Sequence, residues 1–462
     1  MLFTSPNKVY MVWPDLPWTP DSVASALNQQ MLIRAMRRVR SLMAMVLLGA
    51  VFLVLVLSNW QIDTAEARLA NQEPLSPGSS RPDPPGKPLR RPKTPAPAPA
   101  PTKLAAASKH PVLNVTVSED FRKFFPHNTA YWSRLLHVFL RQHDRSHAVT
   151  PPADWNECKE ASLEVLKTNV HDFDAYPDLH KNFLRMCHCR NPPLLREPKN
   201  CTSEGNGPFL LLAIKSAPSN FQRRQAVRET WGTGGVHLGG LSVRTIFLLG
   251  GSSSVDPDLS PLLEYEARRY RDVLQWDFHE SLFNLTLKFD AFFKWTWRNC
   301  RDASFVFSGD DDVFVNTPAI LEYLRALAPE AASRLYVGQV ISPASPIRDP
   351  KSKYYIPQSY YEGAYPPYAG GGGFLFSGAL LGRLAQLSSL IPLFPIDDVY
   401  VGMCVHALGV APEKHPGFQT FDVAESNREN MCVHKQLMVI HRRTPREVKR
   451  LWKGIHSPSL TC

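Results

Sequence analysis

The chain has 462 residues, of which 44% are hydrophobic and 20% are charged, and it carries a net charge of +10. Residues 1–111 hold 13 basic and 6 acidic side chains, so they account for most of that charge and leave the rest of the chain nearly neutral. A nearly neutral main body offers little that could follow a phosphate backbone, and we expect neither DNA nor RNA as a partner.

Residues 41–62 are predicted to be a transmembrane signal-anchor. This stretch has no charged side chain, and its centre, Leu42–Leu57, is almost wholly apolar. As a helix the uncharged stretch would extend roughly 33 Å, enough to cross a bilayer. Arginines precede it and acidic residues follow it, so the positive-inside rule predicts that residues 1–40 are a cytosolic tail and that the topology is type II.

A cleaved signal peptide and a later start are the alternative interpretations of this region. Ala65–Ala67 loosely resembles a signal-peptidase cleavage site, but the apolar stretch is long for a signal peptide and these alanines lie far beyond its end. Met31 is an alternative start that would give a shorter cytosolic tail. The strongly apolar part of the anchor is short, which favours the thin membranes of the early secretory pathway.

Residues 63–111 are predicted to be a proline-rich lumenal stem. Eleven prolines lie between Pro74 and Pro101. Such a segment cannot form a core and extends as polyproline II at about 3.1 Å per residue. We therefore expect it to hold the following residues away from the membrane.

All eight cysteines follow the stem, which indicates an oxidising lumen. They are Cys158, Cys187, Cys189, Cys201, Cys300, Cys404, Cys432 and Cys462. Four disulfides would allow 105 pairings, and the sequence does not choose among them. A zinc site at Cys187, Cys189 and Cys201 is the weaker interpretation, because no second cysteine or histidine pair accompanies them. Three sequons on the same side are candidates for N-glycosylation, at Asn114, Asn200 and Asn284.

Residues 112–207 are expected to form a cysteine-containing region next to the stem. In the following region, residues 208–462, predicted strands alternate with predicted helices. Apolar runs of strand length occur at 209–216, 243–249, 273–276 and 305–307, and helical patterns lie between them at 221–230, 259–270 and 282–297. This alternation predicts an α/β fold with a mostly parallel sheet that is covered by helices on both faces. Ligands of such sheets bind beyond the carboxyl ends of the strands.

Three consecutive aspartates, Asp310–Asp312, follow the last of these strands. Alternate side chains of an extended chain share a face, so Asp310 and Asp312 can converge on one cation while Asp311 points away. Carboxylates suit Mg²⁺ or Mn²⁺, either of which would neutralise a departing diphosphate. An acidic turn and a Ca²⁺ loop are the alternatives, and the place at a strand end favours the catalytic metal site.

Asp397 and Asp398 stand at the start of a predicted helix. Aspartate is a common N-cap, so one of the two could simply bind backbone amides, whereas the other could face the cleft as a general base. Upstream, Gly370–Gly373 lie between Tyr368 and Phe374. This arrangement predicts either a close approach of backbone to a sugar or a mobile loop.

Basic residues follow the first strand. Arg223 and Arg228 would lie where guanidinium groups can meet the phosphates or ribose of a nucleotide, although a solvated helix face is the alternative. His441, at the end of an apolar run, is a candidate nitrogen ligand or a structural histidine. Lys353 belongs to a polar and aromatic segment, 352–357.

In this order the motifs resemble the β1,3-glycosyltransferases of the secretory pathway, and within them the β1,3-N-acetylglucosaminyltransferases, nearest to the polylactosamine-extending branch. The resemblance is dense from Pro208 to Cys462 and thinner from Cys158 to Cys201. It is carried by the segments 209–216, 223–232, 283–288, 309–315, 353–357, 368–374 and 396–402.

The resemblance implies a GT-A nucleotide-sugar fold for residues 208–462, with UDP-GlcNAc as donor and Mn²⁺, or alternatively Mg²⁺, as cofactor. Transferred by motif, Asp312 and His441 would bind the metal and Asp398 would be the catalytic base. The residues expected to contact the donor are Asp310, Asp311, Arg223, Arg228, Lys353, Gly371 and Gly372.

The activity implied is inverting transfer of GlcNAc to the 3-hydroxyl of a terminal galactose on a glycoprotein or glycolipid, extending poly-N-acetyllactosamine. It would take place in the Golgi, where the chain could also form homo- or hetero-oligomers with other glycosyltransferases. One alternative is a β1,3-galactosyltransferase, although Asp397 stands where such relatives usually have glutamate. The other is a catalytically silent lumenal partner of another transferase, which should lack Asp312 or Asp398, and both are present.

Overall fold

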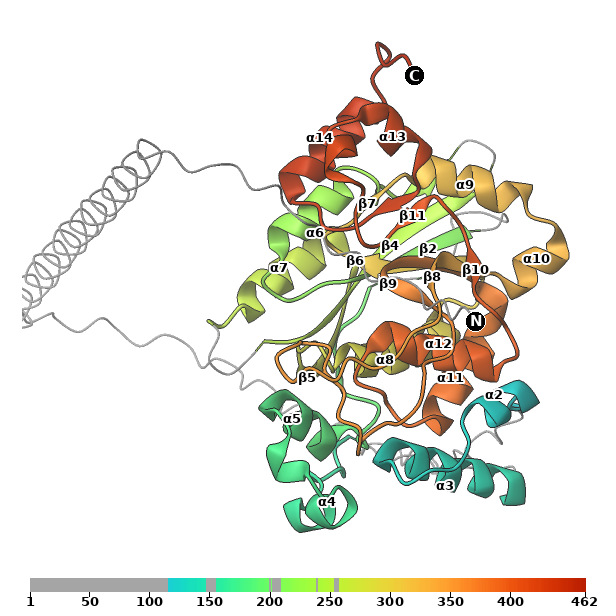
Figure 1. Ribbon diagram of the computed structural model, residues 1–462. Coiled ribbons are helices and arrows are strands. Elements are labelled where there is room, and N and C mark those ends of the chain that lie inside the picture. The colour runs from blue at the N-terminus through green and yellow to red at the C-terminus, as the bar shows by residue number, and fades with distance from the viewer. Residues whose placement is uncertain (1–114, 147–154, 199–200, 202–208, 238–239, 253–256) are drawn as a thin grey trace, which may run out of the picture. The chain divides into compact units, whose positions relative to one another are not determined.

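The structure is a computed structural model that describes residues 115–146, 155–198, 201, 209–237, 240–252 and 257–462 (Figure 1). These residues belong to one compact unit, Leu104–Cys462. The predicted tail, anchor and stem lie outside the described residues, as do Asn114 and Asn200. Among the helices that are described, none is long and apolar enough to cross a membrane.

A central sheet with the strand order β1-β5-β4-β2-β6-β9-β8-β10 runs through this unit, and β3 pairs with β4. Its strands are β1 (Leu194–Arg196), β2 (Phe209–Lys215), β3 (Gly235–Val236), β4 (Ser242–Gly251), β5 (Val273–His279), β6 (Ala303–Asp310), β8 (Tyr336–Ile341), β9 (Tyr368–Ser377) and β10 (Glu413–Lys414). The four predicted strands are β2, β4, β5 and β6, and the predicted helices between them are present.

The prediction of a mostly parallel sheet holds only for the centre of the sheet. The strands β5, β4, β2 and β6 are parallel neighbours, whereas β9 pairs antiparallel with both β6 and β8, and β1 pairs antiparallel with β5. The sheet is therefore mixed. The strand β9 was not predicted, because four glycines interrupt its apolar residues and leave only Phe374–Phe376 as a run.

Helices cover both faces of the sheet (Figure 1). They are α6 (Phe221–Arg228), α7 (Ser260–Tyr270), α8 (Leu285–Asn299), α9 (Thr317–Ala326), α10 (Pro329–Arg334), α11 (Leu381–Leu390), α12 (Asp397–Ala407), α13 (Met431–Gln436) and α14 (Pro445–Ile455). The first core cluster contains residues of α8, α11 and α12, and the second contains residues of α6, α7, α9 and α14. Alternate residues of β2 enter the two clusters, Leu211 the first and Leu212 the second, as expected for a strand buried on both faces.

Helices α2 (Glu119–Phe124), α3 (Tyr131–Ser146), α4 (Leu163–Asn169) and α5 (Asp178–Met186) precede the sheet in the chain. Their apolar side chains share the first core cluster with α8 and α12. Trp132 of α3 packs edge-on against Phe394, and its indole nitrogen donates to the Pro392 carbonyl at 3.1 Å. This contact fixes α3 to the segment that leads into α12.

A second, three-stranded sheet has the order β11-β12-β7. Its strands are β11 (Phe418–Gln419), β12 (Val439–Ile440) and β7 (Phe314–Val315). In the antiparallel pair of β12 and β7, Ile440 lies opposite Phe314. Because Asp312 comes just before β7 and His441 just after β12, this register brings the two side chains together.

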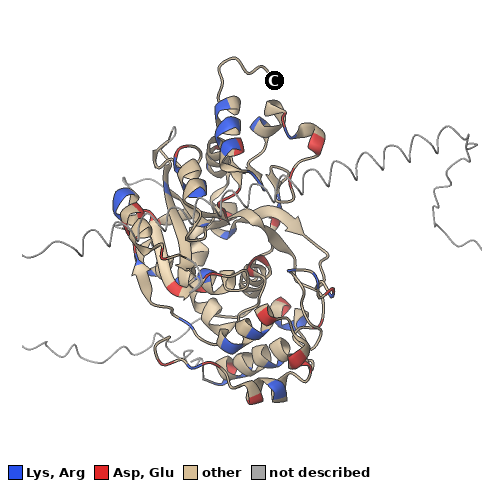
Figure 2. Ribbon diagram, turned by 90° about the vertical axis from the view of Figure 1, so that its left-hand side faces the viewer, with Lys and Arg blue, Asp and Glu red and all other residues tan. Residues whose placement is uncertain are grey.

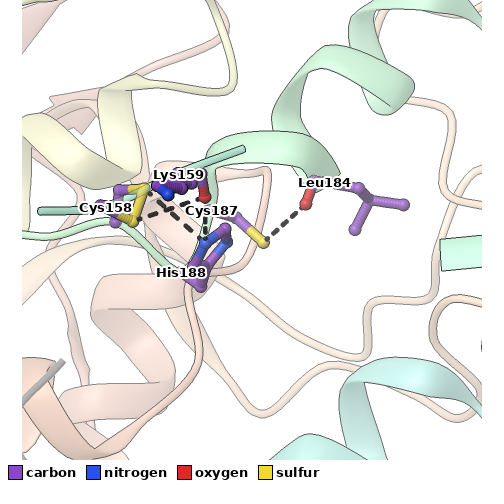
Figure 3. Close-up of a disulfide and its surroundings, with 6 residues drawn as sticks. Cys158, Lys159, Leu184, Cys187 and His188 are labelled. Carbon is purple, nitrogen blue, oxygen red and sulfur yellow. Dashed lines mark hydrogen bonds between the residues drawn. A yellow bond between two sulfur atoms is a disulfide. The ribbon is translucent and has the colours of Figure 1, made fainter. Parts of the chain in front are cut away.

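Three disulfides join cysteines of the described region: Cys158–Cys189, Cys201–Cys300 and Cys432–Cys462. The prediction of disulfides is confirmed, and because Cys187 and Cys404 are unpaired, the eight cysteines form three bridges rather than the four that their number allows. Figure 3 shows the Sγ of Cys187 turned from the neighbouring disulfide toward the Leu184 carbonyl, at 3.7 Å. Cys189 and Cys201 are each held in a disulfide and are not free thiolates, which argues against the zinc interpretation.

Candidate active site

A cleft of about 690 Å³ lies at the carboxyl ends of β2 and β6. Its walls contain the end of β2, the triple aspartate, the glycines of β9, the start of α12 and His441. Figure 2 shows acidic and basic positions interspersed along the helices of the described region. The residues that line the cleft include six carboxylates, those of Glu280, Asp310, Asp311, Asp312, Asp397 and Asp398.

Asp310, Asp312 and His441 form a group that could hold a metal ion, because one ligand atom from each lies within 4.8 Å of the others. The Nε2 atom of His441 is 3.2 Å from Asp312 Oδ1 and 3.6 Å from Asp310 Oδ2. Its Nδ1 atom lies 2.9 Å from the Thr420 carbonyl oxygen, which orients the ring and directs Nε2 to the carboxylates. Two carboxylates and an imidazole fit Mn²⁺ or Mg²⁺.

The electrostatics of this group differ from residue to residue. Burial raises the pKa of Asp310, and Lys215 only partly offsets it. Burial would also raise the pKa of Asp312, but His441 and Arg223 outweigh it and lower the pKa. Asp312 is therefore the more readily ionised of the two carboxylates, as expected for a metal ligand.

Asp311 lies with Asp312 in the turn that follows β6, but it is not part of the group with His441. Its carboxylate accepts from Ser216 Oγ at 2.7 Å, Asn220 Nδ2 at 2.9 Å and Arg223 Nη1 at 3.0 Å. The side chain is only 5% exposed. Asp311 thus joins the end of β6 to the start of α6, and its contact with the nucleotide stays a prediction.

Lys215, the last residue of β2, was missed by the sequence analysis. Its Nζ is 2.7 Å from Asp397 Oδ2, 3.1 Å from Asp310 Oδ1 and 3.2 Å from the Gly371 carbonyl oxygen. Burial would lower the pKa of Lys215, but Asp310 and Asp397 outweigh it and raise the pKa, so the ammonium stays charged. The position of Lys215 at the end of an otherwise apolar strand is the feature of the sequence that could have identified it as a site residue.

Asp398 lies in the cleft at the start of α12. Its Oδ2 accepts from the Gly371 amide at 2.9 Å, and its Oδ1 accepts from the Val399 amide at 2.8 Å. Burial and the neighbouring charge of Asp397 raise the pKa of Asp398 to about 7. A carboxylate with that pKa is a suitable general base near neutral pH. Asp397 is not an N-cap, because its carboxylate pairs with Lys215 instead.

The four glycines form the middle of β9, so the expectation of a mobile loop is wrong. A Cβ on Gly371 would lie 3.2 Å from Asp398 Oδ2, and a Cβ on Gly372 would lie 3.1 Å from His441 Cγ. Both glycines line the cleft. Their lack of a side chain lets the base and the histidine lie directly against the strand, a reason that the sequence analysis did not give.

The other predicted donor residues are divided by the structure. Arg223 is 40% exposed in the cleft, where its Nη1 also lies 3.1 Å from Asp312 Oδ2, and Lys353 is exposed on the cleft wall. Arg228 is not among the cleft residues, because it pairs with Glu266 and Asp272 at 2.7 Å each. Arg228 is five positions after Arg223 in the same helix, so its side chain is rotated by about 140° around the helix axis and points away from the cleft.

The remaining sequon in the described region, Asn284, caps α8. Its Nδ2 donates to the His279 carbonyl at 2.8 Å, and the hydroxyl of Thr286 donates to the Phe394 carbonyl at 2.5 Å. Asn284 is only partly exposed, and Thr286 is buried. Modification at Asn284 stays a prediction.

Comparisons with known proteins identify the family. The sequence profile of the galactosyltransferase family matches residues 222–416. N-acetyllactosaminide β1,3-N-acetylglucosaminyltransferase 2 from Mus musculus is 50% identical over 64% of this chain and 75% of its own length, and the Homo sapiens protein of that name is 44% identical over 74% and 89%. UDP-GlcNAc:βGal β1,3-N-acetylglucosaminyltransferase 8 from Homo sapiens is 37% identical over 80% of this chain and 91% of its own length.

Among solved structures, the galactosyltransferase LgtC in complex with donor and acceptor sugar analogs aligns with a TM-score of 0.28 and 11% identity, over 55% of this chain and 97% of that chain. A similarity this weak carries no argument. The sequence relatives are sufficient, because their identity extends over most of their length. The chain therefore belongs to the β1,3-N-acetylglucosaminyltransferases of the galactosyltransferase family.

Proposed function

We propose that this chain transfers GlcNAc from UDP-GlcNAc to the 3-hydroxyl of a terminal galactose, with inversion, and extends poly-N-acetyllactosamine. The observation that carries the proposal is Asp398, a carboxylate with a pKa of about 7. It lies against Gly371 of β9, and His441, which belongs to the group with Asp310 and Asp312, lies against the next residue, Gly372. The relatives include UDP-GlcNAc:βGal β1,3-N-acetylglucosaminyltransferase 8, and the donor and acceptor in that name support the same substrates for this chain.

In this proposal the region 208–462 is a GT-A domain, and Asp312 and His441 hold Mn²⁺, or Mg²⁺ in its place. When bound, such an ion would neutralise the charge that develops on UDP as it leaves. Arg223 carries free guanidinium donors into the cleft beside Asp312 and would bind diphosphate oxygens. Lys353, on the cleft wall, would contact the donor with the backbone of Gly371 and Gly372.

The proton and the new bond follow from the position of Asp398. Its carboxylate takes the proton of the galactose 3-hydroxyl as that oxygen attacks C1 of GlcNAc from the face opposite UDP. The bond from C1 to UDP breaks with its electron pair on the UDP oxygen, and the α-linked donor gives a β-linked product. Lys215 holds Asp397 and the Gly371 carbonyl, and thereby fixes the strand whose amide binds the base.

The test is transfer by the purified full-length chain from UDP-GlcNAc to a lactosamine acceptor with Mn²⁺. We expect a β1,3-linked GlcNAc product. The description of the family profile as galactosyltransferase makes UDP-Gal the informative second donor. Transfer from UDP-Gal alone would indicate a galactosyltransferase, and binding of UDP without turnover of either donor would indicate a silent partner of another transferase.

We also propose that residues 1–40, 41–62 and 63–111 are the cytosolic tail, anchor and stem of a type II Golgi membrane protein, with residues 112–207 as the region next to the stem. The supporting observations are the distribution of charge and apolar residues in the sequence. Protease protection of Golgi vesicles, with removal of N-glycans from Asn114, Asn200 or Asn284, tests this topology. Digestion of the region 208–462 in intact vesicles would contradict it.

A further inference from the structure

Three features of the cleft follow one another along β9. Gly372 faces His441, Gly371 faces Asp398, and Tyr368 begins the strand. At about 3.3 Å per residue, Tyr368 lies more than roughly 10 Å along the strand from the candidate metal ligands, with the base between them. UDP would leave from the metal end, and inversion requires attack from the opposite face, so the end near Tyr368 is the acceptor side.

Tyr365 lies on this acceptor side, three residues before β9. It lines the cleft and is 6% exposed. Its amide donates to the Ala344 carbonyl at 2.9 Å, and its ring stacks on Tyr361 and meets Phe394 and Tyr368 edge-on. These contacts pack the ring between its aromatic neighbours at the edge of the cleft.

The hydroxyl of Tyr365 is buried and has no hydrogen-bond partner among the described residues. Three nearby buried tyrosines differ, because their hydroxyls have partners: Tyr361 donates to the Ala364 carbonyl, Tyr360 donates to the Leu393 carbonyl, and Tyr336 accepts from the Ala369 amide. A buried polar group without a partner destabilises a fold, so an orphan in a ligand cleft calls for an explanation.

We propose that the Tyr365 hydroxyl is a specificity determinant that binds an acceptor hydroxyl on a carbon adjacent to the one attacked. This inference rests on the proposed function. A small tilt of the ring toward the cleft would present the hydroxyl, which can both donate and accept a hydrogen bond. A site that binds a substrate hydroxyl discriminates against an analogue without it, because the polar group of the site is then left unpaired.

The experiment compares the full-length chain with Tyr365→Phe on a β-galactoside and on its 2-deoxy and 4-deoxy analogues. For the wild type, we expect removal of one of these two hydroxyls to raise the acceptor KM by about tenfold. Tyr365→Phe should raise the KM of the parent galactoside by a similar factor and should show no further loss with that analogue. The KM of UDP-GlcNAc should change by less than about twofold.

Tyr361→Phe is the matched control. Its ring is buried beside Tyr365, but its hydroxyl already has a partner and it is not among the residues that line the cleft. We expect Tyr361→Phe to lower the melting temperature without changing discrimination among acceptors, and Tyr365→Phe to leave the melting temperature unchanged or raise it.

An unchanged acceptor KM in Tyr365→Phe would overturn the inference. It would also be overturned if, for both deoxy analogues, the rise in KM caused by the variant and the rise caused by the missing hydroxyl multiplied as independent effects. Transfer by the wild type would leave the proposed function standing in either case. If the wild type transferred GlcNAc to no galactoside, the proposed function itself would fail, and this inference with it.

Discussion

The aspartates in the cleft differ in their partners, and the partners assign their tasks. Asp312 and Asp310 face His441, and Asp311 accepts from three donors that lie between the end of β2 and the first turn of α6. Asp397 pairs with Lys215, and Asp398 accepts two backbone amides. Only Asp398 combines a raised pKa near neutrality with two fixed hydrogen bonds. We therefore expect different carboxylates to take the proton and to bind the metal.

The pKa of Asp398 predicts the pH dependence of the reaction. Because the base must be ionised and its pKa is raised to about 7, the rate should fall about tenfold per pH unit below neutrality. The pH profile of kcat, measured from pH 5 to pH 9, checks this prediction. A rate that stayed level down to pH 5 would show that the base has an ordinary carboxyl pKa or is another group.

The same shift predicts how stability depends on pH. An aspartate in the unfolded chain ionises near pH 3.9, whereas Asp398 in the fold ionises near 7, so between those values the folded state holds more protons. The contribution of Asp398 to stability is therefore full below about pH 4 and is lost as the pH rises to about 7. In melting experiments, the melting temperature of Asp398→Asn relative to that of the wild type should rise between pH 5 and pH 8. A constant difference would contradict this prediction.

Metal binding should separate Asp312 from its neighbour Asp311. We expect Asp312→Asn to weaken Mn²⁺ binding by about a hundredfold, because it alters a carboxylate beside His441. Asp311→Asn is the matched change, and it should keep Mn²⁺ affinity within a few fold while lowering the melting temperature. Titration followed by electron paramagnetic resonance measures the affinity. Equal losses in both variants would contradict the assignment of separate roles.

At the scale of elements, three segments distant in sequence build the site around β9. The start of α12 brings Asp398 against Gly371, and the end of β12 brings His441 against Gly372. The antiparallel pairing of β12 with β7 sets His441 beside Asp312. The glycine strand is thus the common support for Asp398 and His441, the proposed base and the proposed metal ligand.

Two neighbouring substitutions test this support. The methyl group of Gly371→Ala would meet Asp398, so we expect kcat to fall by roughly ten- to a hundredfold with Mn²⁺ affinity kept. The methyl group of Gly372→Ala would meet His441, so we expect weaker Mn²⁺ binding. Each variant is the control for the other, and identical effects on both quantities would show that the strand simply misfolds.

Much of this element-level arrangement could be predicted from the sequence. Apolar runs revealed β2, β4, β5 and β6, and Asp310 and Asp312 lie near each other and His441, although Asp311 and Asp312 are in a turn and share Arg223. The glycine strand and the ion pairs of Lys215 could not be predicted, because neither leaves a periodic pattern and both depend on contacts between distant segments. The helical periodicity of residues 221–230 would have predicted that Arg223 and Arg228 do not face the same side.

At the scale of the whole molecule, the sheet lies between two hydrophobic cores, and the helices of residues 115–198 extend one of them. The disulfide Cys201–Cys300 joins a residue that precedes β2 to the end of α8 across 99 positions. A bridge that closes a loop of this length constrains the unfolded chain strongly.

Removal of that bridge should be the more damaging cysteine change. We expect Cys201→Ser with Cys300→Ser to lower the free energy of unfolding by about 4 kcal/mol, and removal of Cys432–Cys462, which spans 30 positions, to have a smaller effect. Cys187→Ser is the control, because this thiol is unpaired and should change stability little. Denaturant unfolding under non-reducing conditions gives the comparison, and the reverse order would contradict it.

The central claim is that Asp398 deprotonates a galactose hydroxyl during transfer of GlcNAc. The most direct measurement is the rate and linkage of the product formed from UDP-GlcNAc and a lactosamine acceptor, for the wild type and for Asp398→Asn. The account predicts a β1,3-linked product from the wild type and a rate at least about a thousandfold lower in the variant, with UDP binding kept. Substantial transfer by Asp398→Asn, or an α-linked product, would contradict it.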